Sequence, residues 1–148
     1  MLLDNIDKEL LALLKVDSRK PVTCLAQILG ISRQTVQKRL HILESKKVIA
    51  GYTIRTGETF NSERFRAQAM LTIDNNVGDS LIAYFTKIPQ VTSVYSVAGN
   101  CDALVTIESN SSEGIDFVLD TIRRHPQVIQ TQSYLLLSQK LDRQWLAS

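Results

Sequence analysis

The residues with the clearest capacity for chemistry form a polar run between positions 32 and 41. The run contains amide, hydroxyl, cationic and imidazole side chains and no acid. Such side chains suit duplex DNA, because glutamine can pair with adenine, arginine and lysine can bind guanine or phosphate, and a hydroxyl at a helix start can bind phosphate. A solvated helix surface has a similar composition. The candidate DNA-contacting residues are Ser32, Arg33, Gln34, Thr35, Gln37, Lys38 and His41.

Three short helices would position this run. Apolar residues recur at helical spacing after Asp4, which can cap the first helix, and again in residues 25–29. Gly30 can adopt a positive φ, and Ser32 can cap a third helix with an apolar stripe of Val36, Leu40 and Leu43. This joint is typical of a helix-turn-helix, and the stripe leaves the polar run on the outer face.

Two further features lie at the end of this unit. Arg39 lies beside the apolar stripe, so a DNA contact and an ion pair with an acid such as Glu44 are both open to it. Residues 48–54 predict a short strand that leads out of the helices. Residues 55–64 have no period and predict a linker.

Beyond Arg66 the apolar period changes to two. The predicted strands are residues 66–73, 92–98, 103–108 and 128–137, with helices through residues 81–88 and 115–122. Pro89-Gln90-Val91 and Pro126-Gln127-Val128 each follow a helix and open a strand, which indicates two similar βαβ halves. The sequence therefore predicts an α+β chain, with an N-terminal helix-turn-helix (winged-helix-like) domain and a C-terminal ferredoxin-like βαββαβ domain.

The predicted limits are residues 1–52 for the first domain, 53–64 for the strand and linker, 65–138 for the second domain and 139–148 for a tail. Both helices of a ferredoxin-like domain cover one face of its sheet, yet Leu135-Leu136-Leu137 places leucine on both sides of the last strand. A second copy of the chain is the simplest cover for the other face, so we expect a homo-oligomer.

The bulk composition is that of a globular protein, with 44% hydrophobic and 22% charged residues. The net charge is only +2, but residues 1–52 hold nine basic against five acidic residues, which favours an anionic partner for that part. Cys24 and Cys101 lie far apart without metal-ligand spacing around them. With neither a long apolar run nor a basic leader, we expect a cytoplasmic protein that needs no membrane, metal or cofactor.

Several motifs in combination resemble the Lrp/AsnC family of leucine-responsive, or feast/famine, regulators. They are Asp4-x-x-Asp7-x-x-Leu10-Leu11, Leu25-Ala26, Gly30-Ile31-Ser32, Val36-x-x-Arg39-Leu40-x-x-Leu43-Glu44, Val48-Ile49-x-Gly51-Tyr52, Gly99-x-x-Asp102 and Thr131-x-Ser133. The resemblance spans residues 4–138. It implies a transcription regulator, not an enzyme, that dimerises through the ferredoxin-like domain, assembles into tetramers or octamers, binds double-stranded DNA and responds to an amino acid.

The candidate effector-binding residues are Gly99, Asn100, Cys101, Asp102, Thr131 and Ser133. Backbone N–H groups beside the glycine suit a ligand carboxylate, and Asp102 suits an ammonium group. A plain hairpin turn would use the same residues equally well. The resemblance implies that a neighbouring dimer brings the two hydroxyl residues near the turn. Family members usually carry an aromatic residue where this chain has Cys101, so the extra room favours a medium apolar effector such as leucine or methionine.

Two other classes of protein compete with this interpretation. One is an enzyme on the same architecture, resembling the siroheme decarboxylases, whose substrate would require converging Arg and His. The segment from residue 53 onward is net acidic and contains one histidine, His125. The other is a sensing or scaffold protein that has lost DNA binding, in which acids would be expected within residues 33–41.

Overall fold

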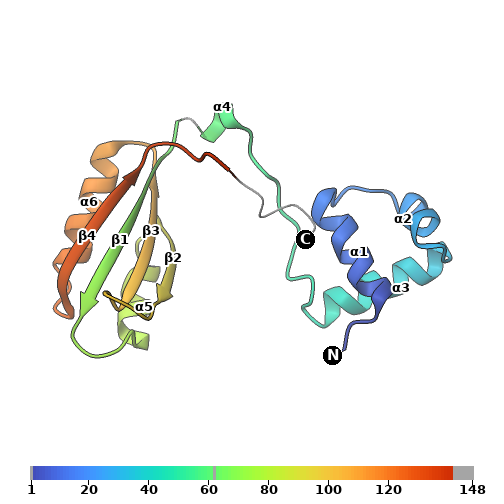
Figure 1. Ribbon diagram of the computed structural model, residues 1–148, viewed down its shortest axis with the longest axis horizontal. Helices are drawn as coiled ribbons and strands as arrows, with labels where there is room; N and C mark the ends of the chain where they lie inside the picture. The colour runs from blue at the N-terminus through green and yellow to red at the C-terminus, as the bar shows by residue number, and fades with distance from the viewer. Residues whose placement is uncertain (1, 62, 142–148) are drawn as a thin grey trace. The chain divides into compact units, whose positions relative to one another are not determined.

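The computed structural model describes residues 2–61 and 63–141, and it forms two compact units (Figure 1). The first unit is built on the chain up to Arg55 and also includes Lys140 and Leu141. The second unit comprises Thr56–Gln139. Among the described residues, no helix has the length and apolarity needed to cross a lipid bilayer.

Three helices form the first unit: α1 (Asn5–Val16), α2 (Val22–Leu29) and α3 (Arg33–Ser45). Asp4 caps α1 and Ser32 caps α3, as the sequence predicted. Gly30 ends α2 with φ of 65°, the left-handed conformation that the tight turn requires. The helices share a small core whose buried members are Leu10, Leu25, Ala26, Val36 and Leu43. The predicted helix-turn-helix is therefore confirmed.

The predicted strand at residues 48–54 is wrong. Ile49 instead packs against the helical core and donates its N–H to Leu43 O at 3.0 Å, whereas Ile54 is exposed. A strand needs a hydrogen-bonded neighbour, and no described segment pairs with these residues. The stretch predicted as a linker contains one short helix, α4 (Glu58–Asn61).

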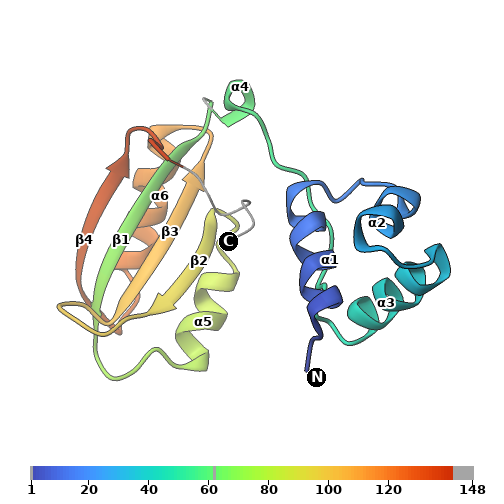
Figure 2. The ribbon, with the colours of Figure 1, turned by 45° about the vertical axis from the view of Figure 1, so that its right-hand side comes forward.

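The second unit follows the order β1 (Phe65–Ile73), α5 (Asp79–Thr86), β2 (Val91–Ser96), β3 (Ala103–Ser109), α6 (Ser112–Arg123) and β4 (Val128–Leu136). Its sheet is antiparallel with the strand order β2-β3-β1-β4. Both helices lie on one face of the sheet (Figure 2). This is the predicted ferredoxin-like arrangement. Strand β2 spans Val91–Ser96, whereas the sequence predicted residues 92–98.

The two faces of the sheet differ in burial. The helix-covered face packs the alternating β1 residues onto α5 and α6, and its buried core includes Ala67, Ala69, Leu71, Val105, Ile107, Leu81, Phe85, Val118 and Ile122. On β4, Leu135 pairs with Ala67 of this face, whereas Leu136 pairs with Arg66 of the other. Leucine therefore does occupy both sides of the strand, as predicted.

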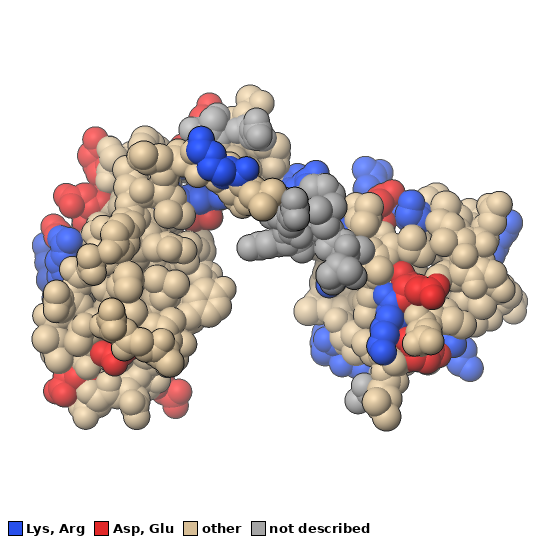
Figure 3. All heavy atoms as spheres, in the orientation of Figure 1, with Lys and Arg blue, Asp and Glu red and all other residues tan. Residues whose placement is uncertain are grey.

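The face without helices, here called the open face, is largely uncharged (Figure 3). The strand registers place five apolar or aromatic side chains on it: Met70, Tyr95, Leu104, Tyr134 and Leu136. Three of these remain substantially exposed, at 58% for Tyr95, 48% for Tyr134 and 44% for Leu136. Of the predicted tail at residues 139–148, residues 142–148 lie outside the described part of the chain.

Candidate nucleic-acid interface

The polar run predicted to contact DNA lies along one side of α3. Ser32, Arg33, Gln34, Gln37, Lys38 and His41 are all exposed, and Thr35 is half-buried. On the opposite side, Val36 and Leu43 are completely buried against α1 and α2. The turn and the core thus present amides, two cations and an imidazole to solvent as one helical surface, here called the α3 face.

Hydroxyl groups organise the start of this helix. Ser32 Oγ accepts a hydrogen bond from the Thr35 N–H at 3.1 Å and lies 2.8 Å from Thr35 Oγ1. Only one of the two hydroxyl protons is needed for the contact between the side chains, so the other can be donated to a phosphate oxygen. The N–H groups of Arg33 and Gln34 have no carbonyl in the preceding turn, which makes the helix start suitable for an anion.

Arg39 is an internal clamp between α3 and α1. Its Nη1 lies 2.7 Å from Asp4 Oδ2 and 2.7 Å from Asp7 Oδ1. The ion-pair alternative is thus the one observed, but Glu44 is the wrong partner. The two aspartates also form the capping box of α1, in which each side chain accepts the other's backbone N–H. The Asp4-x-x-Asp7 spacing is a sequence signal for this capping box, but not for its contact with Arg39.

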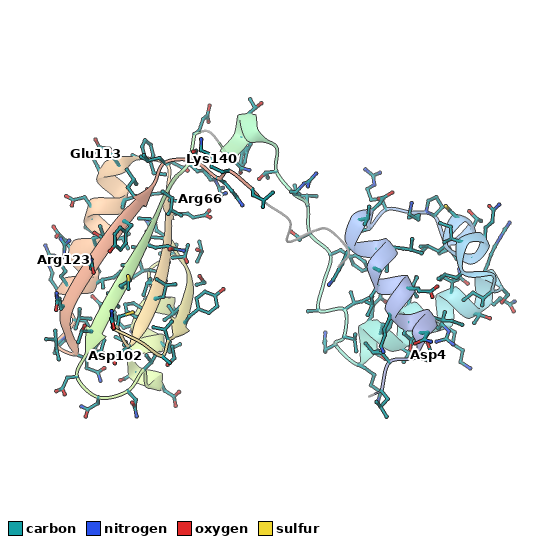
Figure 4. The ribbon with its side chains drawn as sticks, in the orientation of Figure 1. Asp4, Arg66, Asp102, Glu113, Arg123 and Lys140 are labelled. Carbon is teal, nitrogen blue, oxygen red and sulfur yellow. The ribbon has the colours of Figure 1, made fainter. Side chains whose placement is uncertain are left out.

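The electrostatics of the clamp follow from these contacts. The Asp7 N–H, together with Arg39, holds the pKa of Asp4 below its usual value. The two carboxylates raise the pKa of Arg39, which keeps it cationic. The label in Figure 4 marks Asp4 at the start of α1.

A second contact at the end of α3 was not predicted. Tyr52 donates its hydroxyl proton to Glu44 Oε1 at 2.7 Å, and this hydrogen bond raises the pKa of Tyr52. The contact ties the chain that leaves the helical core back onto α3. Both residues belong to the motifs quoted above, but their separation in sequence does not reveal that they meet.

Four predicted effector residues do form the turn between β2 and β3. Gly99 and Asn100 are exposed, whereas Cys101 and Asp102 are half-buried. Asp102 Oδ2 accepts the Ile73 N–H at 2.9 Å, and the Asp102 N–H donates to Leu71 O at 2.8 Å. Asp102 therefore joins the turn to the end of β1, at the opposite end of the sheet from Arg66 (Figure 4).

The other two predicted effector residues lie apart from this turn. Leu71 pairs with Ala103 on one side and with Thr131 on the other, so β1 separates the turn from β4. Adjacent strands lie roughly 4.8 Å apart, which puts about 10 Å between the two groups. Thr131 Oγ1 is buried without a hydrogen-bond partner among the described residues, and Ser133 is exposed. A single chain does not bring all six residues together.

His125 and the two cysteines were the other residues considered for chemistry. His125 Nδ1 accepts the Gln127 N–H at 3.2 Å, and the centroid of its ring lies 4.6 Å from that of Tyr84. Cys24 and Cys101 are free and half-buried. Within the described part of the chain, no three His, Cys, Asp or Glu side chains gather into a possible metal site.

Comparison with known proteins covers both units. An AsnC-type helix-turn-helix domain matches residues 3–44, and an Lrp/AsnC ligand binding domain matches residues 66–146. The HTH-type transcriptional regulator LrpA of Mycobacterium tuberculosis is 31% identical over 92% of this chain and 91% of its own length.

Solved structures agree with this match. A feast or famine regulatory protein of M. tuberculosis, complexed with L-methionine, has a TM-score of 0.86 and 29% identity, and the alignment covers 99% of this chain and 100% of that one. AsnC of Escherichia coli shares the fold, with a TM-score of 0.85 at 19% identity over 97% of each chain. With the helix-turn-helix and ferredoxin-like units both matched, the chain belongs to the Lrp/AsnC family of helix-turn-helix transcriptional regulators.

Proposed function

We propose that this regulator places the α3 face in the major groove of DNA and that a small amino acid, bound at the ferredoxin-like unit, modulates the contact. The observation that carries the proposal is the exposure of five polar side chains on α3 and of its N-cap Ser32, at a helix start whose first N–H groups have no carbonyl partner in the preceding turn. Gln34 and Gln37 have the amides that suit adenine, and Arg33 and Lys38 have the charges that suit guanine or phosphate.

The DNA-bound form is a dimer or a larger even assembly. The open face combines Tyr95, Tyr134 and Leu136, all substantially exposed, with few charges. An apolar face of this kind promotes aggregation of a monomer, and a second copy would cover it by two-fold symmetry. Two tethered helix-turn-helix units then bind two half-sites together, which raises affinity by effective concentration.

The proposed effector is a medium apolar amino acid such as leucine or methionine. Support comes from the relative that was solved with L-methionine and from Cys101, which is smaller than the aromatic residue that family members usually carry at this position. One oxygen of Asp102 is engaged by Ile73, so the other is the atom proposed to meet the ammonium group. The unpartnered hydroxyl of Thr131 would come from a neighbouring copy, because β1 separates it from this turn.

Two features favour a regulator over the competing classes. His125 is packed on Tyr84 and accepts a backbone N–H, so it does not form part of a cationic substrate site. No acid lies within residues 33–41, so nothing on the α3 face repels phosphate. We therefore propose a DNA-binding regulator without enzymatic activity.

A salt titration of DNA binding tests the proposal. Duplexes selected from a random library are labelled, and affinity of the full-length chain is measured by fluorescence anisotropy at several salt concentrations. Affinity should fall steeply with salt because phosphate contacts release counterions. Lys38→Ala should weaken binding and reduce the salt slope, whereas Arg123→Ala on α6 is the matched control and should change neither. Failure to select any duplex, or binding that ignores salt, would refute the proposal.

A further inference from the structure

An apolar groove on the first unit lies between α1 and α2. Ala12, Leu13 and Val16 of α1 and Ile28 and Leu29 of α2 line it, and it encloses about 330 Å³. Val16 and Ile28 are 57% and 54% exposed. Leu13 and Leu29 also pack against the core of the unit, but Val16 and Ile28 remain exposed, so no described residue covers the mouth of the groove.

We propose that residues 142–148 of the same chain dock in this groove and place Trp145 and Leu146 in it. These two are the large apolar residues of the segment that follows Leu141. A tryptophan ring offers the large apolar surface that a groove of this size can bury. Arg143 precedes them, and Glu9, which lines the groove, forms no ion pair with another described residue.

The length of chain beyond Leu141 sets how far Trp145 can reach. Lys140 and Leu141 are already grouped with the first unit. Trp145 follows Leu141 by four residues, and an extended chain spans up to about 3.4 Å per residue, so Trp145 can reach any point within roughly 14 Å of that anchor. A separate molecule would have to bind from solution, whereas the tail of the chain is present at high effective concentration.

Docking of this tail would give the helix-turn-helix unit a second connection to β4, in addition to the linker. Strand β4, which carries Thr131 and Ser133, ends at Leu136, and residues 137–141 connect it to the tail. A shift of β4 would thus reach α1 and α2 by a route separate from the linker at residues 55–64. The inference does not depend on the identity of the effector or on the DNA contacts proposed above.

Trp145 is the only tryptophan of the chain, so its emission reports on the tail alone. In the full-length protein we expect emission at short wavelength and resistance to acrylamide quenching. Ile28→Glu should move the emission to longer wavelength and expose the ring to the quencher. Phe117→Glu is the matched control, because Phe117 is 65% exposed on α6 of the other unit, and it should leave the emission unchanged.

Ala12→Phe provides a second test, since it fills the groove without adding a charge and should displace Trp145 in the same way. Circular dichroism must show that each variant retains its helices. Glu9→Arg should weaken docking, and Arg143→Glu in that background should restore it. Emission of the unaltered protein that equals that of the urea-unfolded chain would overturn the proposal, as would short-wavelength emission that survives both folded groove variants.

Mixed oligomers identify which chain supplies the tail. A chain with Ile28→Glu and its own Trp145 is combined with a chain that has an intact groove and Trp145→Ala. Docking within one chain predicts long-wavelength emission from this mixture. Short-wavelength emission would mean that the tail docks on the neighbouring copy, which would overturn the assignment to the same chain.

Discussion

Arg39 and Asp7, which are 32 positions apart, form an ion pair of 2.7 Å that joins the DNA-facing helix to the first helix of the unit. The side chains are 24% and 10% exposed, so solvent screens this contact less than a surface pair. Arg39 is therefore a positioning residue for α3, while the residues of the α3 face remain available for DNA.

Replacing Arg39 by methionine should destabilise the first unit by about 1–3 kcal/mol, because it leaves the Asp7 carboxylate nearly buried without its partner. Urea denaturation of the full chain measures this loss. DNA affinity should fall while the salt slope stays unchanged, since no phosphate contact is lost. Arg123→Ala, which removes an exposed pair with Asp120, is the control and should cost less than about 1 kcal/mol. Equal losses of unfolding free energy in Arg39→Met and Arg123→Ala would contradict the role of Arg39 as a clamp.

The clamp also predicts a dependence of stability on pH. The pKa of Asp4 in the folded state is lowered from 3.8 by the Asp7 N–H and by Arg39. The contribution of the Asp4 carboxylate to the free energy of unfolding is therefore complete above the pKa of Asp4 in the unfolded chain. It is lost as the pH falls through the lower pKa of the folded state. Asp4→Asn keeps a capping oxygen but not the charge. The unaltered chain should exceed this variant in stability at pH 6, and the difference should vanish as the pH falls below the lowered pKa of Asp4.

Measuring the effect of Asp4→Asn in an Arg39→Met background isolates the contribution of Arg39 to the lowered pKa of Asp4. Without the guanidinium, the pKa of Asp4 should be less depressed, so the stability difference that Asp4→Asn produces in this background should depend less on pH. In the chain that retains Arg39, a stability difference that stays constant from about pH 6 to about pH 3 would argue against this assignment.

Gly30 provides a test of the turn between α2 and α3. Its φ is 65°, and a Cβ added there would meet nothing within 4 Å, so Gly30→Ala costs only backbone strain. That strain amounts to roughly 1–2 kcal/mol. Gly51 has equally open surroundings but no positive φ, so Gly51→Ala should be neutral or slightly stabilising. Thermal unfolding of the two variants compares them directly, and an equal change in melting temperature would exclude strain as the cause.

The open face makes a prediction about assembly. Leu136→Lys, combined with Tyr134→Lys, should convert the oligomer to a monomer of 16.6 kDa, because it places two charges in the proposed interface. Light scattering coupled to size exclusion measures the mass. Phe117→Lys adds a charge at an exposed aromatic residue on α6 and should leave the assembly intact. An unaltered chain that is already monomeric at micromolar concentration would contradict the proposed interface.

Local signals in the sequence were sufficient for the elements but not for their long-range partners. Asp4, Ser32 and Gly30 act within one turn of a helix, and the alternation in β1 reflects burial on one face, so these features were predictable. The prediction of a strand at residues 48–54 was wrong because strand formation depends on a hydrogen-bonded neighbour that the sequence of one segment does not specify. The partners of Arg39 were missed for the same reason, since they lie across the helical core.

The effector turn is the part of the candidate site where structure and function are hardest to separate, because Asp102 serves the turn through its bond to the Ile73 N–H at 2.9 Å. Asp102→Asn retains an oxygen acceptor for this N–H and removes the charge, whereas Asp102→Ala removes both. If the carboxylate binds the ammonium group of an amino acid, Asp102→Asn should abolish the thermal shift produced by leucine or methionine without lowering the melting temperature of the unliganded protein. Asp102→Ala should lose the shift and also about 1 kcal/mol of stability, as expected for one hydrogen bond. A thermal-shift series with the twenty amino acids on all three proteins distinguishes the roles: an unaltered response in Asp102→Asn would make Asp102 a turn residue alone.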